Sequence, residues 1–570
     1  MPGSGKETSA LRPIYDNPFA FFAAGAAIGA FIFLMIYDKY FLSISNTRWI
    51  WQTGEDMIQH QLGLMFFKNA PWEFPLGCYR SYPYPALNSI VYTDSLPLLA
   101  LLSKALRAIL PPFLQYWGIW VLFSFMMQGG LSMLICRKAG LSFSLAAFSA
   151  PLFICSMVFI HKAFHQCALS SHWIILLAFL LWLHHDDIHY HYIRCILWAL
   201  LCCLAVSVHF YFLPMVGFIM LSDCIYGWLS DRKVLRYIFL LLAAATCTCL
   251  VWYILGGFSA GDPSKGKWGN YVVNLLAFFN PKEYSNFFPE IKMASGVKSE
   301  RAYLGVAFIL LFLITLVYSA YRRIKIKKIE QGKNNEQCGT VAAMGPNGKS
   351  KLIAALIPAC ILSIWAVGPV LSIGEYILFD ARPLIPYPIS ATLSIIRTSS
   401  RMIWPVYYAL LFLIAYYFNK VFKGSRAAAL VLMGCAATLQ YAEIIPNHTI
   451  NSKEFPSGAR YESEFYNGLE QMVGGAKSHL AYLSPEASRY KEPAIYAAEH
   501  FMTMNNGYFA RKVENPDYEN TVEDIRLGRL RADTLYCIPD KEEVLDKYEI
   551  NLPENGIMEK IGEFYVVFTP

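Results

Sequence analysis

The chain has 570 residues, of which 56% are hydrophobic, 15% aromatic and only 16% charged. These proportions exclude an ordinary water-soluble protein, in which about 25% of residues are charged. The net charge of +7 comes largely from basic clusters between apolar stretches, where membrane topology explains it, so we expect no nucleic-acid partner. The lipid bilayer is the expected solvent for most of the chain.

Apolar stretches long enough to cross a hydrocarbon core of about 30 Å as helices recur from residue 19 to residue 444. We therefore predict a mainly α-helical, polytopic membrane protein with about eleven spans. The first stretch is too long for a cleaved signal and is interpreted as a signal anchor. The expected spans are residues 19–42, 114–136, 142–160, 168–185, 194–210, 212–229, 236–256, 302–320, 352–372, 403–419 and 427–444.

Basic residues cluster in alternate connections between these spans. If residues 1–18 form a cytoplasmic tail, these clusters all fall on the cytoplasmic side, as the positive-inside rule requires. This topology depends on residues 209–214, which must separate two closely spaced spans. If these two spans were one, the orientation of every later span and loop would be inverted. The clusters lie at 137–138, 232–236, 322–351 and 420–426.

An odd number of spans places the carboxy-terminal region on the external side of the membrane. Residues 19–445 then form the transmembrane domain, and the polar residues 446–570 form an external domain. Three long external loops accompany it, at 43–113, 257–301 and 373–402. We expect function on this side.

The first external loop is expected to contain helices that lie on the membrane. Residues 51–68 predict a helix on which Asp56, His60 and Gly63 share one face. Residues 95–110 are apolar but carry two basic residues and are flanked by prolines, which is typical of an interfacial segment rather than a span.

The carboxy-terminal region alternates short apolar runs with helical stretches. Residues 479–483, 534–538 and 564–568 predict strands, and residues 493–502 and 541–547 predict helices. A small α/β domain is the simplest interpretation.

Glu55 and Asp56 stand just behind the first span, in a long aromatic loop that also contains Asp94. One carboxylate could act as a general base that takes the proton of a hydroxyl nucleophile, an effect worth about 10²- to 10⁴-fold in rate. The alternative is that Glu55 and Asp56 are first-turn acidic residues that stabilise a helix N-terminus.

Basic and histidine side chains from several external loops could hold a phosphate or pyrophosphate group. For each of them singly, snorkelling or headgroup contact at the interface is the simpler explanation. A histidine-rich run at 184–191 lacks a recognised ligand spacing and falls in a short cytoplasmic turn, so no metal site is predicted there. The candidate donor- and acceptor-binding residues are His60, Asp94, Lys162, His165, His209, Lys267, Arg397 and Arg401.

Four runs, GEDMIQHQLGLMFFKNAPWEFPLG, SIVYTDSLPLLALLSKAL, GNYVVNLLAFFNP and IIRTSSRMIWPVYY, resemble a family of bacterial multi-span proteins that is similar to GT-C glycosyltransferases. The resemblance implies an acidic motif in the first external loop, a polyprenyl-phosphate sugar donor and location in the bacterial inner membrane with a periplasmic carboxy-terminal domain. It makes Asp56 first, and Glu55 second, the expected base of an inverting transfer. Because some GT-C enzymes use a divalent ion and others do not, a metal cofactor stays open.

The resemblance predicts a glycosyltransferase that decorates a surface glycan or lipid on the periplasmic side. Nucleotide sugars are unavailable there, so the sugar would come from a lipid carrier. Loop aromatics could stack against the sugar or form an interfacial belt; these are Trp51, Trp72, Tyr79, Tyr82 and Tyr84. Two alternatives are a ligase or polymerase of lipid-linked glycans and a lipid or solute transporter.

Overall fold

A computed structural model describes residues 17–259, 268–331, 346–453, 461–473, 477–484, 489–510, 518–540 and 548–570. In this part of the chain, nine helices are long and apolar enough to cross a membrane. They are α2 (Pro18–Ile36), α6 (Trp117–Lys138), α10 (His191–Val208), α11 (Phe212–Asp231), α12 (Val234–Ile254), α13 (Val306–Gln331), α14 (Pro346–Val367), α16 (Trp404–Val421) and α17 (Arg426–Lys453). The predicted helical, membrane-type architecture is therefore present.

Two of the eleven expected spans are not single long helices. Residues 142–160 fall on α7 (Phe143–Ile154) and α8 (Met157–His165), which meet at a bend of 52°. Residues 168–185 correspond to a shorter apolar helix, Cys167–Leu183, whose regular part is α9 (Trp173–Leu183). Apolar composition predicts burial in lipid but does not reveal where a helix breaks.

The doubtful turn at 209–214 does separate two helices. Helix α10 ends at Val208 and α11 begins at Phe212, with the Phe212 backbone N–H donating to the carbonyl of His209 at 3.0 Å. Pro214 lies in the first turn of α11, where a missing backbone N–H leaves no helical hydrogen bond unmade.

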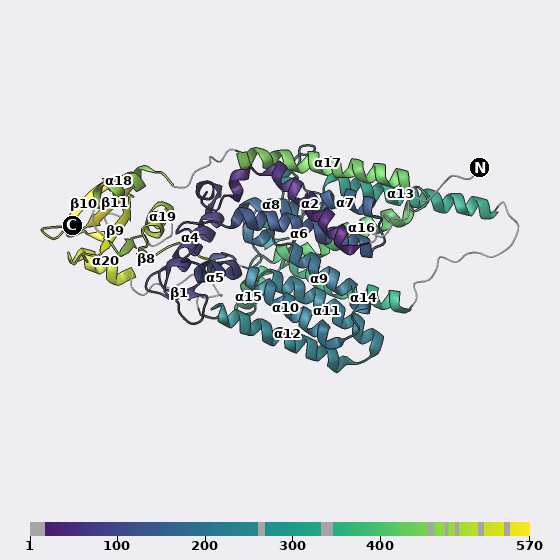
Figure 1. Cartoon of the computed structure of the whole chain (residues 1–570), viewed down its shortest axis with the longest axis horizontal. Coiled ribbons are helices and arrows are strands. Elements are labelled where there is room, and N and C mark those ends of the chain that lie inside the picture. Colours follow the sequence, from purple (N-terminus) through teal and green to yellow (C-terminus); the bar gives the residue numbers. More distant parts are fainter. Residues whose placement is uncertain are drawn as a thin grey trace.

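The basic clusters gather at one end of the helix bundle. There Lys138 pairs with Asp187 and Lys351 with Asp186, each at 2.5 Å. The first loop and the carboxy-terminal domain lie at the opposite end of the long axis (Figure 1). The basic clusters therefore distinguish this end of the bundle from the other.

The first loop contains the expected helices, but in shorter pieces. The chain breaks at Gly54, which has φ of +126° and separates α3 (Ile50–Thr53) from α4 (Glu55–Asn69). The interfacial segment forms α5 (Pro97–Ala105). Its Lys104 is buried, donates to the carbonyl of Pro71 at 3.0 Å and lies 4.1 Å from the centre of the Phe67 ring, so its charge is compensated inside the loop.

The carboxy-terminal domain contains a five-stranded mixed sheet of order β10-β11-β9-β7-β8. Strands β7, β8 and β9 are parallel, whereas β11 is antiparallel to both β9 and β10. All three predicted strands are present, and the predicted helix at 493–502 is α19. The strands are β7 (His479–Tyr482), β8 (Thr503–Met504), β9 (Thr534–Pro539), β10 (Ile557–Ile561) and β11 (Phe564–Phe568), and the helices are α18 (Glu464–Met472), α19 (Lys491–Glu499) and α20 (Tyr518–Arg526).

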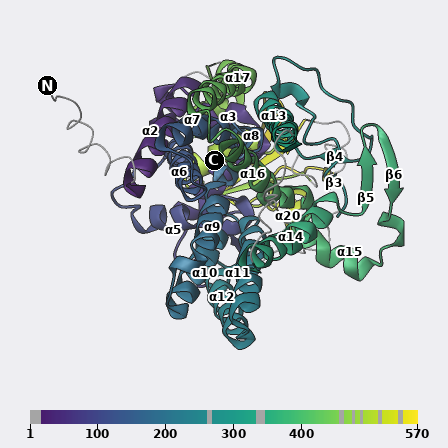
Figure 2. The same cartoon turned by 90° about the vertical axis from the view of Figure 1, so that its right-hand side faces the viewer.

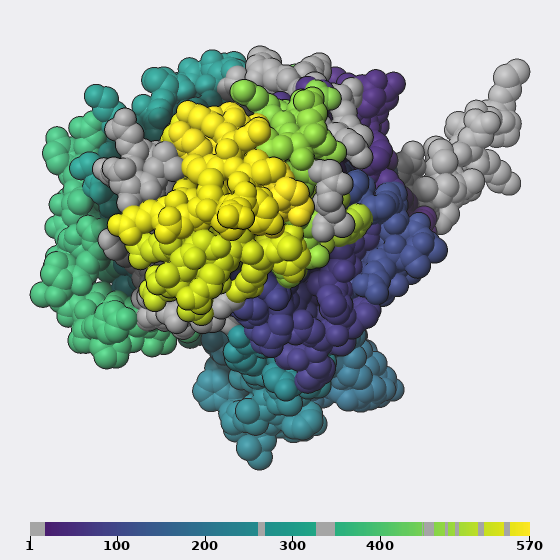
Figure 3. Space-filling view, turned by 90° about the vertical axis from the view of Figure 1, so that its left-hand side faces the viewer, coloured from purple at the N-terminus to yellow at the C-terminus, as the bar shows by residue number. Residues whose placement is uncertain are grey.

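This domain rests on the first loop. The backbone N–H of Met504 donates to the carbonyl of Ser81 at 3.0 Å, and that of Tyr84 donates to the carbonyl of Met504 at 2.7 Å. Figure 3 shows the domain in yellow over the middle of this end of the molecule, beside the purple first loop. The expected domain start at residue 446 falls inside α17, and the predicted helix at 541–547 lies outside the described residues.

Candidate active site

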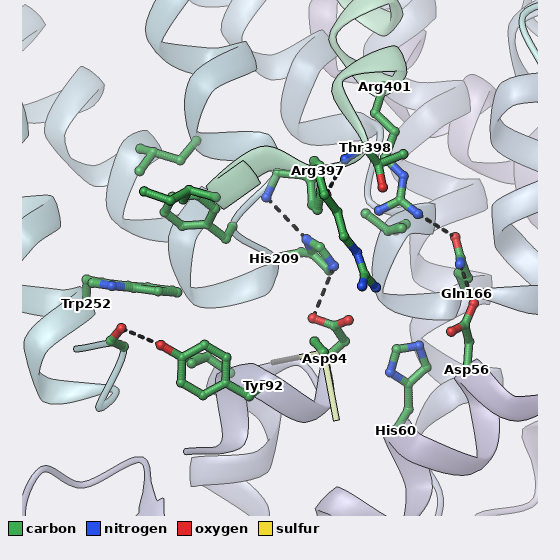
Figure 4. Close-up of a pocket in the computed structure, with 18 of the residues that line it drawn as sticks. Asp56, His60, Tyr92, Asp94, Gln166, His209, Trp252, Arg397, Thr398 and Arg401 are labelled. Carbon is green, nitrogen blue, oxygen red and sulfur yellow. Dashed lines mark hydrogen bonds and ion pairs between the residues drawn. The ribbon is translucent and has the colours of Figure 1, made fainter. Parts of the chain in front are cut away.

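A cavity of about 600 Å³ opens where the first loop meets the ends of the long helices that lie nearest the carboxy-terminal domain. Six of the candidate residues line it, and they come from four separate parts of the chain (Figure 4). These six are Asp56, His60, Asp94, His209, Arg397 and Arg401. Loops that are distant in sequence therefore do converge.

Helix α4 presents Asp56 and His60 to the cavity from consecutive turns of the same face. The next residue on this face, Gly63, lies against the loop that carries Asp94. A Cβ atom at Gly63 would lie 2.2 Å from Oγ1 of Thr93, so only glycine permits this approach. Ser95 Oγ then donates to the carbonyl of His60 at 2.7 Å, which ties the loop to α4.

Asp56 is oriented by Gln166, which directly follows α8. Gln166 Nε2 donates a hydrogen bond to Oδ2 of Asp56. Gln166 Oε1 accepts from Lys162 Nζ at 2.9 Å and from Arg401 Nη2 at 3.2 Å. The amide thus links the carboxylate to two cations while keeping it out of a direct ion pair with them.

Asp94 has a different partner and a left-handed backbone, with φ of 52°. The Tyr211 backbone N–H donates to Nδ1 of His209 at 3.2 Å, and Nε2 of the same ring lies 3.3 Å from Oδ1 of Asp94. Burial raises the pKa of the Asp94 carboxyl, but the interactions with His209, His60 and Arg401 together outweigh burial and lower this pKa to about 2. Asp94 is therefore ionised and weakly basic.

His60 lines the cavity and is 3% exposed. Its Nδ1 lies 3.0 Å from the carbonyl of Thr93, so Nδ1 carries the proton. Its Nε2 has no hydrogen-bond partner in the part of the chain that the structure describes. Burial lowers the pKa of His60 despite the opposing charges of Asp94 and Asp56, so the neutral ring is favoured.

The two arginines approach from the segment that precedes α16. Figure 4 shows the Arg397 guanidinium pointing into the space between Asp94 and Asp56. The Arg401 guanidinium lies 4.7 Å from the centre of the Tyr211 ring, and the Tyr211 hydroxyl accepts from the Thr398 backbone N–H at 3.1 Å. Cations and carboxylates therefore share one end of the cavity.

Apolar residues also line the cavity, namely Leu213, Cys249, Trp252, Phe258 and Ile395, of which Cys249 and Trp252 belong to α12. Trp252 lies on the side away from Asp56 and Arg401 (Figure 4). Tyr92, whose hydroxyl donates to the carbonyl of Gly257 at 2.7 Å, closes this side. Such a cavity fits a ligand with an anionic head and an apolar tail.

Residues 26–445 match the model of a domain of unknown function, DUF6311. The chain belongs to the DUF6311 family. Residues 469–570 match the DUF6311 C-terminal domain. No curated protein matches the chain. The cavity draws on both matched segments, because Ala510 of the C-terminal domain also lines it and its backbone N–H donates to the carbonyl of Tyr92 at 2.9 Å.

Of the candidate residues that the structure describes, three do not line the cavity of this DUF6311 chain. Glu55 is exposed and lies outside the cavity. Consecutive residues of a helix point about 100° apart, and Asp56 is the one that points into the cavity. Lys162 lies behind Gln166, and the His165 ring lies 5.3 Å from that of His161. Lys267 is outside the described residues.

The aromatic residues expected to contact a sugar lie elsewhere in the DUF6311 fold. Trp51, Tyr79 and Tyr82 are buried in the core, Trp72 lies over Lys104, and Tyr84 stacks on His479. The cavity instead uses Tyr92, Tyr211 and Trp252. Sequence reasoning also missed Gln166 and Tyr92, although each stands within two residues of a candidate.

The described part of the DUF6311 chain holds no group of three or more His, Cys, Asp and Glu side chains placed to bind a metal ion. In the histidine-rich turn, Nδ1 of His185 lies 2.5 Å from Oδ1 of Asp223, while Asp186 and Asp187 pair with lysines. Those side chains join helices at the basic end of the bundle.

Proposed function

We propose that this protein is a membrane glycosyltransferase, similar to GT-C enzymes, that moves a sugar from a polyprenyl-phosphate donor to a glycan or lipid acceptor. The observation that carries the proposal is the cavity itself, which is lined by two arginines and two carboxylates and has an apolar side that includes Trp252 (Figure 4). The charged groups suit the phosphate and sugar, and the apolar side suits the first part of a lipid tail.

In the proposed step the acceptor hydroxyl attacks the anomeric carbon of the donor sugar and gives its proton to Asp56. The new bond between the acceptor oxygen and this carbon forms as the bond to the phosphate oxygen breaks, with inversion. The electron pair leaves with polyprenyl phosphate, and Arg397 and Arg401 stabilise its growing charge.

Asp94 is poorly suited to act as the base. The pKa of Asp94 is held at about 2, so its carboxylate has little tendency to take a proton. Asp56 is held by the neutral amide of Gln166, which orients the carboxylate without neutralising it. His60 and Asp94 are then left to bind donor or acceptor hydroxyls.

The basic clusters at one end of the bundle support the orientation that we propose. With the basic end in the cytoplasm, the cavity and the carboxy-terminal domain face the periplasm of a bacterial inner membrane. A lipid-linked donor can reach this side, whereas nucleotide sugars cannot.

The test compares surface glycans of cells that lack the protein with those of cells that produce variants of it. Asp56→Asn should lose the glycan modification while the protein accumulates normally in the membrane, because the amide cannot take the proton. Glu55→Gln is the matched control, since this neighbouring carboxylate lies outside the cavity, and it should keep the modification. Full activity of Asp56→Asn would contradict the role of Asp56.

A further inference from the structure

An apolar unit projects from the side of the bundle just before the cavity arginines. It consists of β5 (Val370–Ile373), β6 (Tyr376–Asp380) and α15 (Tyr387–Leu393), and we call it the lateral hairpin unit. Viewed along the long axis of the molecule, β5, β6 and α15 lie at its periphery, away from the packed helices (Figure 2).

The outer strand β6 exposes apolar side chains on both of its faces. Tyr376 is 73% exposed, Leu378 56% and Phe379 56%, and successive residues of a strand point to opposite faces. Leu384 and Tyr387 extend this surface, at 71% and 68% exposed. Two strands with apolar residues on both faces would be poorly stable in water, since neither face shields the other.

The inner strand β5 fixes the unit firmly to the molecule. The Leu275 backbone N–H donates to the carbonyl of Ser372, and Asn274 Nδ2 donates to Ser372 Oγ, each at 3.0 Å. The Gly374 backbone N–H donates to Asn274 Oδ1, also at 3.0 Å. The exposure of β6 is therefore a property of a fixed element and not of a loose loop.

The surrounding surface identifies what covers this unit. The hairpin follows α14 directly, and the outer face of α14 is apolar and exposed, with Ile364 at 73%. The unit carries few charges, and two of them neutralise each other because Arg382 Nη2 lies 2.6 Å from Oδ2 of Asp380. Its surface therefore continues the membrane-facing surface of the bundle.

We infer that the lateral hairpin unit docks into the interfacial region of the bilayer, on the leaflet at the cavity end. The outer edge of β6 excludes a deeper position, because hydrocarbon cannot satisfy the hydrogen bonds of a strand edge, whereas headgroups and water can. Exposed tyrosines such as Tyr376 and Tyr387 are typical of this depth. Resting on the proposed function, this docking would hold Ile395 and Arg397 at the depth of a lipid phosphate.

The test places a photo-crosslinking amino acid at Leu378 in the full chain, reconstituted in vesicles of phosphatidylethanolamine and phosphatidylglycerol. Mass spectrometry should find a phospholipid adduct, with a yield close to that from Ile364 on α14. The same substitution at Leu527, which is exposed on the carboxy-terminal domain, should give far less adduct. No glycosyl donor is needed, so failure of the proposed function would leave this result unchanged.

A crosslinked dimer in place of the lipid adduct would overturn the inference, because a second copy would then cover the unit. An adduct yield at Leu378 as low as that at Leu527 would also overturn it. If the Leu378 variant does not fold, Leu384 provides a second position on the same surface, to which the same outcomes apply.

Discussion

Two carboxylates in one cavity acquire different properties from their neighbours. Asp94 faces His209 and becomes a fixed negative charge, whereas Asp56 faces the amide of Gln166. This difference separates a residue that binds from a residue that can take a proton, since a strongly stabilised carboxylate is a weak base. The environment of each carboxylate, and not its residue type, supports its proposed role.

The low pKa of Asp94 predicts a pH-dependent contribution to stability. A carboxyl with a folded-state pKa of about 2, against a model value of 3.8, stabilises the fold above pH 3.8 and loses this effect as pH falls towards 2. Asp94→Asn should therefore cost up to about 2 kcal/mol near neutral pH, with the difference from wild type shrinking in acid. Unfolding of the purified protein in detergent, measured across this range, checks it; a difference that does not change with pH would contradict it.

At the scale of helices, breaks in the expected spans build the site. The bend between α7 and α8 and the end of α8 at His165 bring Gln166 to Asp56. The break at Gly54 lets α4 start at Glu55, so that its first turn faces the cavity.

Helices α2 and α6 pack through glycines, in the small-xxx-small pattern of membrane helices. A Cβ atom at Gly29 would lie 2.1 Å from the carbonyl oxygen of Phe125, and one at Gly25 would lie 2.3 Å from that of Gly129. Gly29→Ala should therefore force the helices apart and lower the free energy of unfolding by about 1–3 kcal/mol.

The matched control for this pair is Gly217→Ala in α11, where an added Cβ would have no neighbour within 4 Å. It should leave stability unchanged or raise it slightly, since alanine favours a helix more than glycine does. Thermal unfolding of both variants in the same detergent provides the comparison, and equal effects would refute the packing argument.

At the scale of the whole molecule, the start of α2 and the carboxy-terminal domain lie at opposite ends of the bundle (Figure 1). Helix α2 starts at Pro18 and runs towards the first loop, and the carboxy-terminal domain rests on that loop. This arrangement is the same whether α7 and α8 form one span or two, and whether α9 is a span.

A reporter enzyme that is active only outside the cytoplasm should therefore be active when fused after Pro570. The reason is that the basic end is expected to stay in the cytoplasm. The same reporter fused before Met1 should be silent, which controls for leakage. The reverse pattern would invert the proposed orientation and remove the periplasmic glycosyl transfer with it.

The sequence by itself determined the membrane character, most long helices, the strands of the last domain and the shared face of Asp56 and His60. These features follow from local periodicity and from the length needed to cross a bilayer, which neighbouring residues encode. Candidate residues such as Asp94, His209 and Arg397 could also be named, because polar side chains in external loops stand out against apolar spans.

Only the tertiary structure decided which of these side chains meet. In the structure Asp56 points into the cavity and Glu55 does not. Gln166 lies between Asp56 and the side chains of Lys162 and Arg401, and Trp252 of α12 lines the cavity. The tertiary structure also buries Tyr79 and Tyr82, which loop composition had suggested as ligand contacts. Such contacts join residues far apart in the chain, and they depend on helix breaks and loop packing that leave no periodic signal in the sequence.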